Sequence, residues 1–207
     1  MNLPTLPCLC VAIAMALLVA GCGKPKVEAL PPGTTVLALG DSLTYGTGAT
    51  PETSYPSHLA SATRWTVVNG GIPGDTAQQG CDRLPSLLDE YRPALVLVFL
   101  GGNDFLRMRP PAALKDGLQR CIAAARAAAI PLVLLAVPTL GLSGFSDASL
   151  YAEFAKAANV PIASPGLGAL LRNDALRADA IHLNGDGYRA LATNVAGELR
   201  RLGYLSP

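Results

Sequence analysis

The stretch "ALVLVFLGGNDF", residues 94–105, is the part of the sequence that best defines the fold. Its first seven residues are apolar and lack the alternation of a half-exposed strand, which predicts a β-strand buried on both faces. Two glycines break the run, and the polar side chains of Asn103 and Asp104 follow at once. A long helical pattern comes next, over residues 110–128. Because buried strands of this kind occur in parallel sheets covered by helices, the stretch predicts an α/β domain with polar groups at a strand end.

The same succession of a short apolar run and a longer helical pattern recurs along the chain. The apolar runs predict strands at 35–39, 65–68, 94–100, 131–137 and 160–163. The helical patterns lie at 54–63, 76–91, 110–128, 147–158 and 184–201. Strands that each lead into a helix form a parallel sheet with helices on both faces. We therefore predict one three-layer α/β/α domain without an internal repeat.

The composition excludes some classes of protein. Of the 207 residues, half are hydrophobic and 15% are charged, which suits one compact domain with a sizeable core. The 16 basic and 15 acidic residues leave a net charge of +1, and no run of Lys and Arg forms a stripe. With a single tryptophan, Trp65, the chain also lacks an aromatic platform for bases. We therefore expect no nucleic-acid partner.

The N-terminal segment has the pattern of an export signal. The apolar run "LCVAIAMALLVA", residues 9–20, has 12 residues, whereas a membrane-spanning helix needs about 20. It ends in "VAGC", which resembles the lipobox of bacterial lipoproteins and implies cleavage before Cys22 and acylation of that cysteine. We predict a lipoprotein signal peptide over 1–21, a lipidated cysteine and flexible tether over 22–33, and the folded domain over 34–207. The residues before the run include no Lys or Arg, so an ordinary secretory signal is the alternative.

The location follows from the same resemblance. Gly23 rather than Asp follows the cysteine, which by resemblance implies the outer membrane of a bacterial envelope, with the protein held there by its lipid. Cys8 and Cys10 would leave with the signal, so Cys81 and Cys121 remain. An even pair of cysteines in an oxidising compartment permits a disulfide, and two free buried thiols are the alternative.

The loops that follow the strands contain a candidate nucleophile and a candidate base. Ser42 follows the first strand in "GDSLT", and a serine needs a neighbouring base to become reactive. The chain has two histidines, and His58 lies in the middle of a helical pattern. His182 follows Asp179 by three positions in a turn, so one loop can supply the base and a carboxylate that orients it. Two histidines also argue against a His-rich metal site.

An oxyanion formed during acyl transfer needs hydrogen-bond donors in place before it forms. Candidates are the backbone N–H of Ser42, the N–H of Gly74 in a glycine-rich loop and the side-chain amide of Asn103. Taken singly, Gly74 could be a turn residue and Asn103 a capping residue. Three acidic residues border these loops, and we expect them to accept backbone N–H bonds and brace the loops. They are Asp41, Asp75 and Asp104.

The four blocks "GDSLT", "GGIPGDT", "GGND" and "DAIH", in this order, resemble the GDSL or SGNH hydrolase family over about residues 34–201. Within the family the chain is most similar to the thioesterase, lysophospholipase and arylesterase branch. The resemblance implies a catalytic triad of Ser42, Asp179 and His182, and an oxyanion hole of Ser42, Gly74 and Asn103. It also implies a flavodoxin-like sheet of five parallel strands and no metal or cofactor. Thr44 replaces the second glycine of G-x-S-x-G, which argues against the α/β-hydrolase nucleophile turn.

The residues around the site indicate the substrate class. The loops at 43–49, 105–110 and 138–145 are apolar with few charges, which favours an acyl chain over a sugar. Leu142 and Phe145 either line an acyl groove or pack within their own loop. The favoured function is a monomeric serine esterase that acts on acyl esters, thioesters or lysophospholipids. The alternatives are an O-acetyl esterase acting on envelope carbohydrate and a catalytically inactive lipoprotein that binds acyl ligands.

Overall fold

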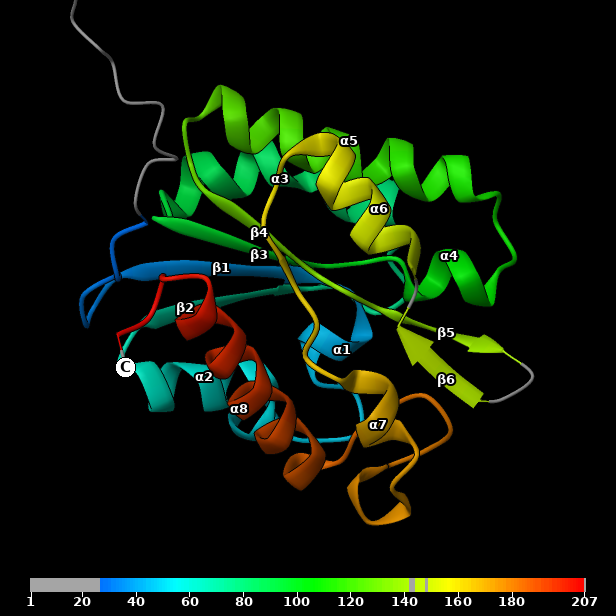
Figure 1. Cartoon of the computed structure of the whole chain (residues 1–207). Helices are drawn as coiled ribbons and strands as arrows, with labels where there is room; N and C mark the ends of the chain where they lie inside the picture. The colour runs from blue at the N-terminus through cyan, green and yellow to red at the C-terminus, as the bar shows by residue number, and fades with distance from the viewer. Residues whose placement is uncertain (1–26, 142–143, 148, 207) are drawn as a thin grey trace, which may run out of the picture.

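A five-stranded parallel sheet lies at the centre of the computed structural model (Figure 1). The structure describes residues 27–141, 144–147 and 149–206, and for 139–141 and 144–147 it describes the backbone alone. The strands are β1 (Thr35–Gly40), β2 (Thr66–Gly71), β3 (Leu95–Phe99), β4 (Leu132–Leu135) and β7 (Ile162–Ala163). Their order is β2-β1-β3-β4-β7, and all neighbouring pairs are parallel. The predicted three-layer α/β fold is confirmed, and the strand order is that of flavodoxin-like sheets.

Helices cover both faces of this sheet (Figure 1). One face carries α3 (Ala77–Tyr91), α5 (Pro111–Ala127) and α6 (Ser149–Ala158). The other carries α2 (Tyr55–Thr63), α7 (Leu167–Leu171) and α8 (Gly185–Arg201). Every residue of β3 is buried between these two layers, which accounts for its unbroken apolar sequence.

Several short elements were not predicted from the sequence. Two short helices, α1 (Ser42–Tyr45) and α4 (Gly102–Leu106), directly follow β1 and β3. Single 3₁₀ turns lie at Pro51–Thr53 and Asp174–Leu176. After β4 the sequence pattern predicted an apolar loop, whereas the chain forms an antiparallel hairpin of β5 (Pro138–Gly141) and β6 (Gly144–Asp147). The chain has left the main sheet there, and the hairpin lets its backbone groups pair locally.

The N-terminal part of the described chain packs on the domain earlier than predicted. The N–H of Leu30 donates to the carbonyl of Tyr204 at 2.9 Å, and the indole N–H of Trp65 donates to the carbonyl of Leu30 at 3.3 Å. Gly33 N–H donates to the Arg64 carbonyl at 2.7 Å. A buried indole N–H needs an acceptor, which Leu30 supplies. Leu30 and Gly33, which were predicted to belong to a flexible tether, are thus hydrogen-bonded to the folded domain.

Some predictions fall outside the described part of the chain. These are the signal peptide (1–21), the lipid-bearing Cys22 and the position of Leu142. The side chain of Phe145 is likewise outside the description.

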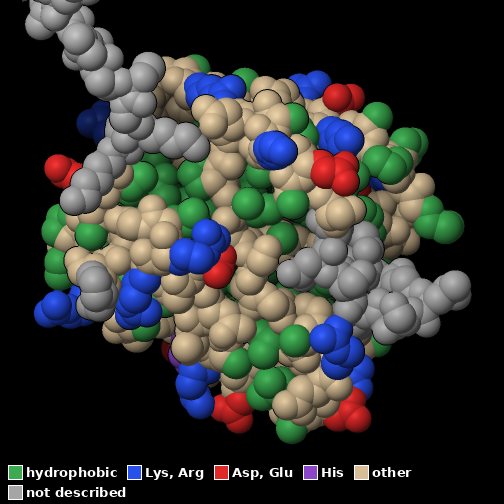
Figure 2. Space-filling model, in the orientation of Figure 1, with side chains coloured by type: hydrophobic (Ala, Val, Ile, Leu, Met, Phe, Trp, Pro, Cys, Tyr) green, Lys and Arg blue, Asp and Glu red, His purple; other side chains and the backbone are tan. Residues whose placement is uncertain are grey.

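In the ranges that the structure describes, no helix combines the length and apolar character needed to cross a membrane. On the face shown in Figure 2, basic and acidic side chains are interspersed.

A disulfide joins the two helices that lie side by side on one face of the sheet. Cys81 of α3 and Cys121 of α5 are bonded, so the alternative of two free thiols does not hold. The helices approach closely at Gly117, where a Cβ would lie 2.6 Å from the N atom of Gln78. Closing a loop across 40 positions of sequence stabilises the fold by about 4 kcal/mol in the chain-entropy model.

Candidate active site

The sequence Gly-Asp-Ser forms a tight turn at the carboxyl end of β1. A Cβ at Gly40 would lie 1.9 Å from the Thr44 hydroxyl oxygen and 2.8 Å from the Phe99 carbonyl oxygen, so only glycine fits. Asp41 caps the short helix α1, and its Oδ1 accepts the Leu43 N–H at 3.0 Å. Ser42 is the first helical residue and lines a cavity at this edge of the sheet. The turn therefore presents the serine side chain to the cavity.

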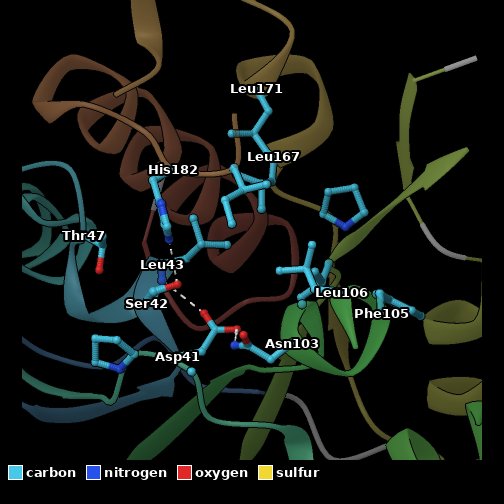
Figure 3. Close-up of a pocket in the computed structure, with 16 residues that line it drawn as sticks. Asp41, Ser42, Leu43, Thr47, Asn103, Phe105, Leu106, Leu167, Leu171 and His182 are labelled. Carbon is cyan, nitrogen blue, oxygen red and sulfur yellow. Dashed lines mark hydrogen bonds between the residues drawn. The ribbon is translucent and has the colours of Figure 1, made fainter. Parts of the chain in front are cut away.

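The imidazole of His182 lies between Ser42 and Asp179 (Figure 3 shows the serine contact). Its Nε2 is 3.0 Å from the Ser42 Oγ, and its Nδ1 is 2.7 Å from the Asp179 Oδ2. The carboxylate favours the tautomer with a proton on Nδ1, which leaves Nε2 free to accept the serine proton. The structure thus brings together the three residues that the sequence assigned to a triad.

Asp179 also fixes the loop that carries the histidine. Its Oδ1 accepts the N–H groups of Ile181 and His182, both at 2.9 Å. Burial acts to raise the pKa of Asp179, but the hydrogen bonds from Ile181 and His182 outweigh it, so the pKa lies below its usual value. The carboxylate is therefore ionised where it faces the imidazole ring.

The loop that carries His182 contacts the segment that follows Ser42. Arg177 and Leu183 form an isolated antiparallel bridge that pairs the two ends of this loop. The hydroxyl of Tyr188, in α8, donates to the carbonyl of Thr47 at 2.8 Å. At Gly48 a Cβ would lie 2.6 Å from the Leu183 carbonyl oxygen, so the two segments touch there. These contacts fix the distance between Ser42 and the ring that it faces.

The segment Ile72-Pro73-Gly74-Asp75 forms a turn beside the serine. The N–H of Asp75 donates to the Ile72 carbonyl at 3.2 Å, and Gly74 has a φ of 88°. Proline in the second position and a positive φ in the third identify a type II turn. The turn type sets the direction of the peptide that carries the Gly74 N–H. Within the described ranges, neither this N–H nor that of Ser42 has an acceptor, and both residues line the cavity.

Asn103 connects the turns that follow the first three strands. It lies in α4, after β3, and its Nδ2 is 3.0 Å from the Asp75 carbonyl oxygen and 3.2 Å from the Asp41 Oδ2. Both amide hydrogens are therefore engaged. To donate to an oxyanion in the cavity, Asn103 would have to share or give up one of these bonds. The sequence did not show that both amide hydrogens are already bonded.

The three acidic residues that border the site have different roles. Asp41 and Asp104 accept backbone N–H bonds as expected, and Asp104 accepts that of Ala77 at 2.8 Å. Asp75 differs, because its carboxylate forms an ion pair with Arg83 at 2.7 Å instead of bracing a backbone N–H. Burial raises the pKa of Asp41 to about 6, although the Leu43 N–H bond acts to lower it.

The cavity has a volume of about 650 Å³, and apolar side chains form much of its wall (Figure 3). These side chains include Leu43, Phe105, Leu106, Val137, Leu167 and Leu171. Leu167 and Leu171 come from α7 and were not predicted to line the site. Their four-residue spacing in "LGALL" just after β7 was the available signal. His58 lies in α2 and does not line the cavity.

The groups at the cavity can support nucleophilic chemistry. A serine in contact with an imidazole can lose its proton as it attacks, and two unpaired N–H groups can stabilise negative charge that develops beside it. Across the described ranges, no three His, Cys, Asp or Glu side chains gather as a metal site would require.

Comparisons with known proteins agree with this geometry. The model of the GDSL-like lipase/acylhydrolase family matches residues 38–190. The chain is 34% identical to thioesterase 1/protease 1/lysophospholipase L1 of Escherichia coli strain K12, over 81% of this chain and 84% of that protein. It is also 34% identical to esterase TesA of Pseudomonas aeruginosa, over 81% of this chain and 89% of that protein. A crystal structure of TesA, 31% identical, superimposes with a TM-score of 0.72 over 82% of this chain and 99% of that chain. The resemblance stated from the four blocks is confirmed.

Proposed function

The chain belongs to the GDSL-like lipase/acylhydrolase family, and from this premise we propose that it is a serine esterase with Ser42 as its nucleophile. One observation carries the proposal. The Ser42 Oγ, the His182 ring and the Asp179 carboxylate form a continuous chain of contacts of 3.0 and 2.7 Å at the wall of an apolar cavity.

The proposed reaction has two steps. The Ser42 Oγ attacks the substrate carbonyl carbon while its proton moves to the His182 Nε2. The tetrahedral intermediate collapses when the ester or thioester bond to the leaving group breaks, and the leaving group takes the proton from His182. A water molecule then attacks the acyl-serine carbonyl carbon as its proton moves to the His182 Nε2. The bond between the acyl group and the Ser42 Oγ breaks, His182 returns the proton to that oxygen, and the carboxylic acid is released. Asp179 stabilises the imidazolium in both steps.

The oxyanion of both steps would form beside the type II turn. The N–H groups of Ser42 and Gly74 are the proposed donors, since each lines the cavity without an acceptor in the described chain. Asn103 is the proposed third donor, in exchange for its bond to Asp41 or Asp75.

We propose acyl esters as the substrate class, and extend the proposal to thioesters and lysophospholipids. The cavity of about 650 Å³, with its leucine side chains, fits an acyl chain rather than a sugar. The names of the relatives, which include thioesterase, lysophospholipase and esterase, support the same class.

A fluorophosphonate probe and a series of p-nitrophenyl esters test this function. We expect the probe to label the wild type and not Ser42→Ala, and turnover of the esters to fall by about 10⁴-fold or more in this variant. We expect turnover to persist beyond acetyl esters, because the cavity accepts a longer chain. Activity confined to acetyl esters would instead favour the O-acetyl esterase. A folded wild type that neither reacts with the probe nor hydrolyses any ester would favour an acyl-binding protein.

We also propose that the protein is exported and held in the cell envelope by lipid on Cys22. The proposal is supported by the lipobox-like "VAGC" after the apolar run. Labelled palmitate should be incorporated into the wild type expressed in a bacterial host, and not into Cys22→Ser. Equal labelling of both proteins would contradict this attachment site.

A further inference from the structure

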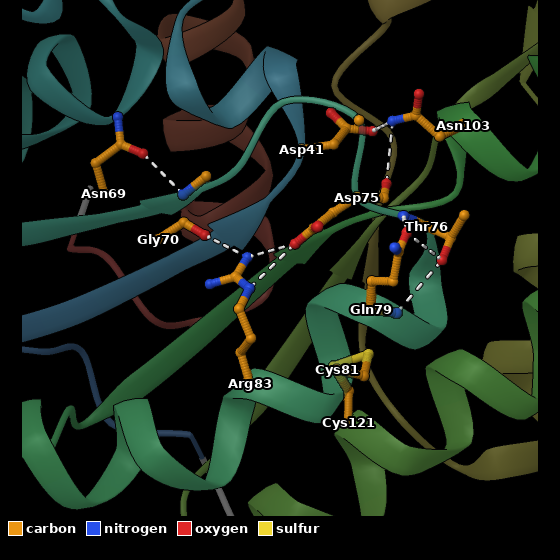
Figure 4. A network of polar contacts seen from close by, with 12 residues as sticks. Asp41, Asn69, Gly70, Asp75, Thr76, Gln79, Cys81, Arg83, Asn103 and Cys121 are labelled. Carbon is orange, nitrogen blue, oxygen red and sulfur yellow. Dashed lines mark hydrogen bonds and ion pairs between the residues drawn. A yellow bond between two sulfur atoms is a disulfide. The ribbon is translucent and has the colours of Figure 1, made fainter.

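The guanidinium of Arg83 joins β2 to the last residue of the type II turn (Figure 4). Its Nη2 donates to the carbonyl of Gly70, in β2 just before the turn, at 3.0 Å. Its Nε and Nη2 donate to the carboxylate of Asp75, the last residue of the turn, at 3.0 and 2.7 Å. Because Arg83 lies two helical turns into α3, one side chain ties the strand, the turn and the helix together.

Asp75 connects the Arg83 bridge to two of the proposed oxyanion donors, the Gly74 N–H and the Asn103 side chain. Its side chain binds Arg83, its N–H closes the turn that presents Gly74, and its carbonyl accepts the Asn103 amide at 3.0 Å. A shift of Asp75 would therefore move the Gly74 N–H and the Asn103 side chain at the same time. The side chains of Asp75 and Arg83 are only 12% and 27% exposed, so water screens their attraction less than on an open surface.

We propose that Arg83 is a positioning residue that holds the oxyanion donors in place through Asp75. This inference rests on the proposed function. Arg83 does not line the cavity, so its effect on the reaction would pass through the turn. Oxyanion donors act within a narrow range of distances, and a displacement of about 1 Å can lower a rate by about 10²-fold.

A second ion pair provides a matched control on the same helix. Asp82 of α3 and Arg120 of α5 approach to 3.3 Å, and their side chains are 49% and 57% exposed. Asp82 precedes Arg83 directly, yet this pair does not reach the turn. Loss of the Arg120 charge therefore disturbs α3 without releasing Asp75, and exposed pairs of this kind contribute little.

The experiment compares Arg83→Met, Arg83→Lys and Arg120→Met on p-nitrophenyl butyrate. We expect Arg83→Met to lower kcat by about 10- to 100-fold with KM changed by less than about threefold, since the donors act on the transition state. Arg83→Lys should recover part of the loss, because it restores a charge but not the two-pronged contact. Arg120→Met should keep the kcat of the wild type. Thermal unfolding of each variant shows that the assayed protein is folded.

The outcomes separate this inference from the proposed function. A folded Arg83→Met with wild-type kcat, or with a loss confined to KM, would overturn the positioning role while Ser42→Ala remains inactive. If Ser42→Ala is active, the proposed function itself fails. Should Arg83→Met not fold, Asp75→Asn breaks the ion pair and keeps the backbone carbonyl, and it must then lower kcat in the same way. A wild-type kcat in folded Asp75→Asn would also overturn the inference.

Discussion

Two carboxylates support the active site from opposite sides, and their surroundings differ. Asp41 stands beside the nucleophile, where it is 3% exposed and its pKa rises to about 6 through burial. Asp179 stands behind His182, where its side chain is 53% exposed and its pKa lies below the usual value. On the buried side, the carboxylate lies among strand-end turns and accepts a hydrogen bond from Asn103. On the exposed side, a single loop holds both the acid and the base.

The difference assigns the two acids to different tasks. A carboxylate that stabilises an imidazolium must be charged, and Asp179 meets this condition because N–H groups compensate its charge. Asp41 has no cation as a hydrogen-bond partner in the described chain, and its two contacts are to Leu43 and Asn103. We therefore interpret Asp41 as a group that joins two turns, and Asp179 as the group that takes part in proton transfer.

The larger effect is expected on the exposed side, from Asp179→Asn. The amide would turn an N–H toward the imidazole and favour the tautomer with its proton on Nε2, which cannot accept the Ser42 proton. We expect kcat for p-nitrophenyl butyrate to fall by about 10³- to 10⁴-fold. Asp186→Asn is the control, because Asp186 is exposed and pairs only with Arg189 in the described chain. If kcat of Asp179→Asn fell by less than about tenfold, the assignment of Asp179 rather than Asp41 to proton transfer would be contradicted.

A smaller effect is expected on the buried side, in the pH dependence of stability. The pKa of Asp41 rises from 3.8 in the unfolded chain to about 6 in the fold, so between these values the native state holds a proton that the unfolded state has lost. Its contribution to the free energy of unfolding therefore falls as the pH rises from about 4 to 6, by about 3 kcal/mol in total. The difference in unfolding free energy between wild type and Asp41→Asn should change over this window.

Urea unfolding at several pH values from 4 to 7 measures that difference. Asp179 and Glu198 have lowered pKa values, and their contributions change in the opposite direction at acidic pH. They are common to both proteins, so they cancel in the comparison. A difference that stays constant across the window would mean that Asp41 titrates alike in the folded and unfolded chains.

Three strands of the sheet could be predicted from the sequence because they are buried on both faces. β1, β3 and β4 are apolar runs for that reason, and their limits were predicted to within a few residues. The end of β2 was not, because Asn69, Gly70 and Gly71 have the composition of a loop. The hairpin at 138–147 was also missed, since its strands pair only with each other and carry no long apolar run.

The site was predictable where residue type and order define the chemistry. His182 could be proposed because the chain has only two histidines, and Ser42 and Asp179 because they stand in the blocks GDSLT and DAIH that resemble the family. The Pro73-Gly74 pair could have indicated the type II turn as well. The Arg83 bridge could not be predicted, because it depends on how α3 docks beside β2. The engaged state of Asn103 likewise depends on distances between three loops.

The hydrogen bonds of Leu30 to the domain bear on which side of the domain would be attached to a surface. Leu30 is hydrogen-bonded to Tyr204 shortly before β1 begins, whereas the cavity is lined by residues that follow the carboxyl ends of the strands. A support reached through the chain before Leu30 would therefore join the domain at the edge of the sheet opposite the cavity. Substrates would then reach the cavity from the side of the domain opposite this junction.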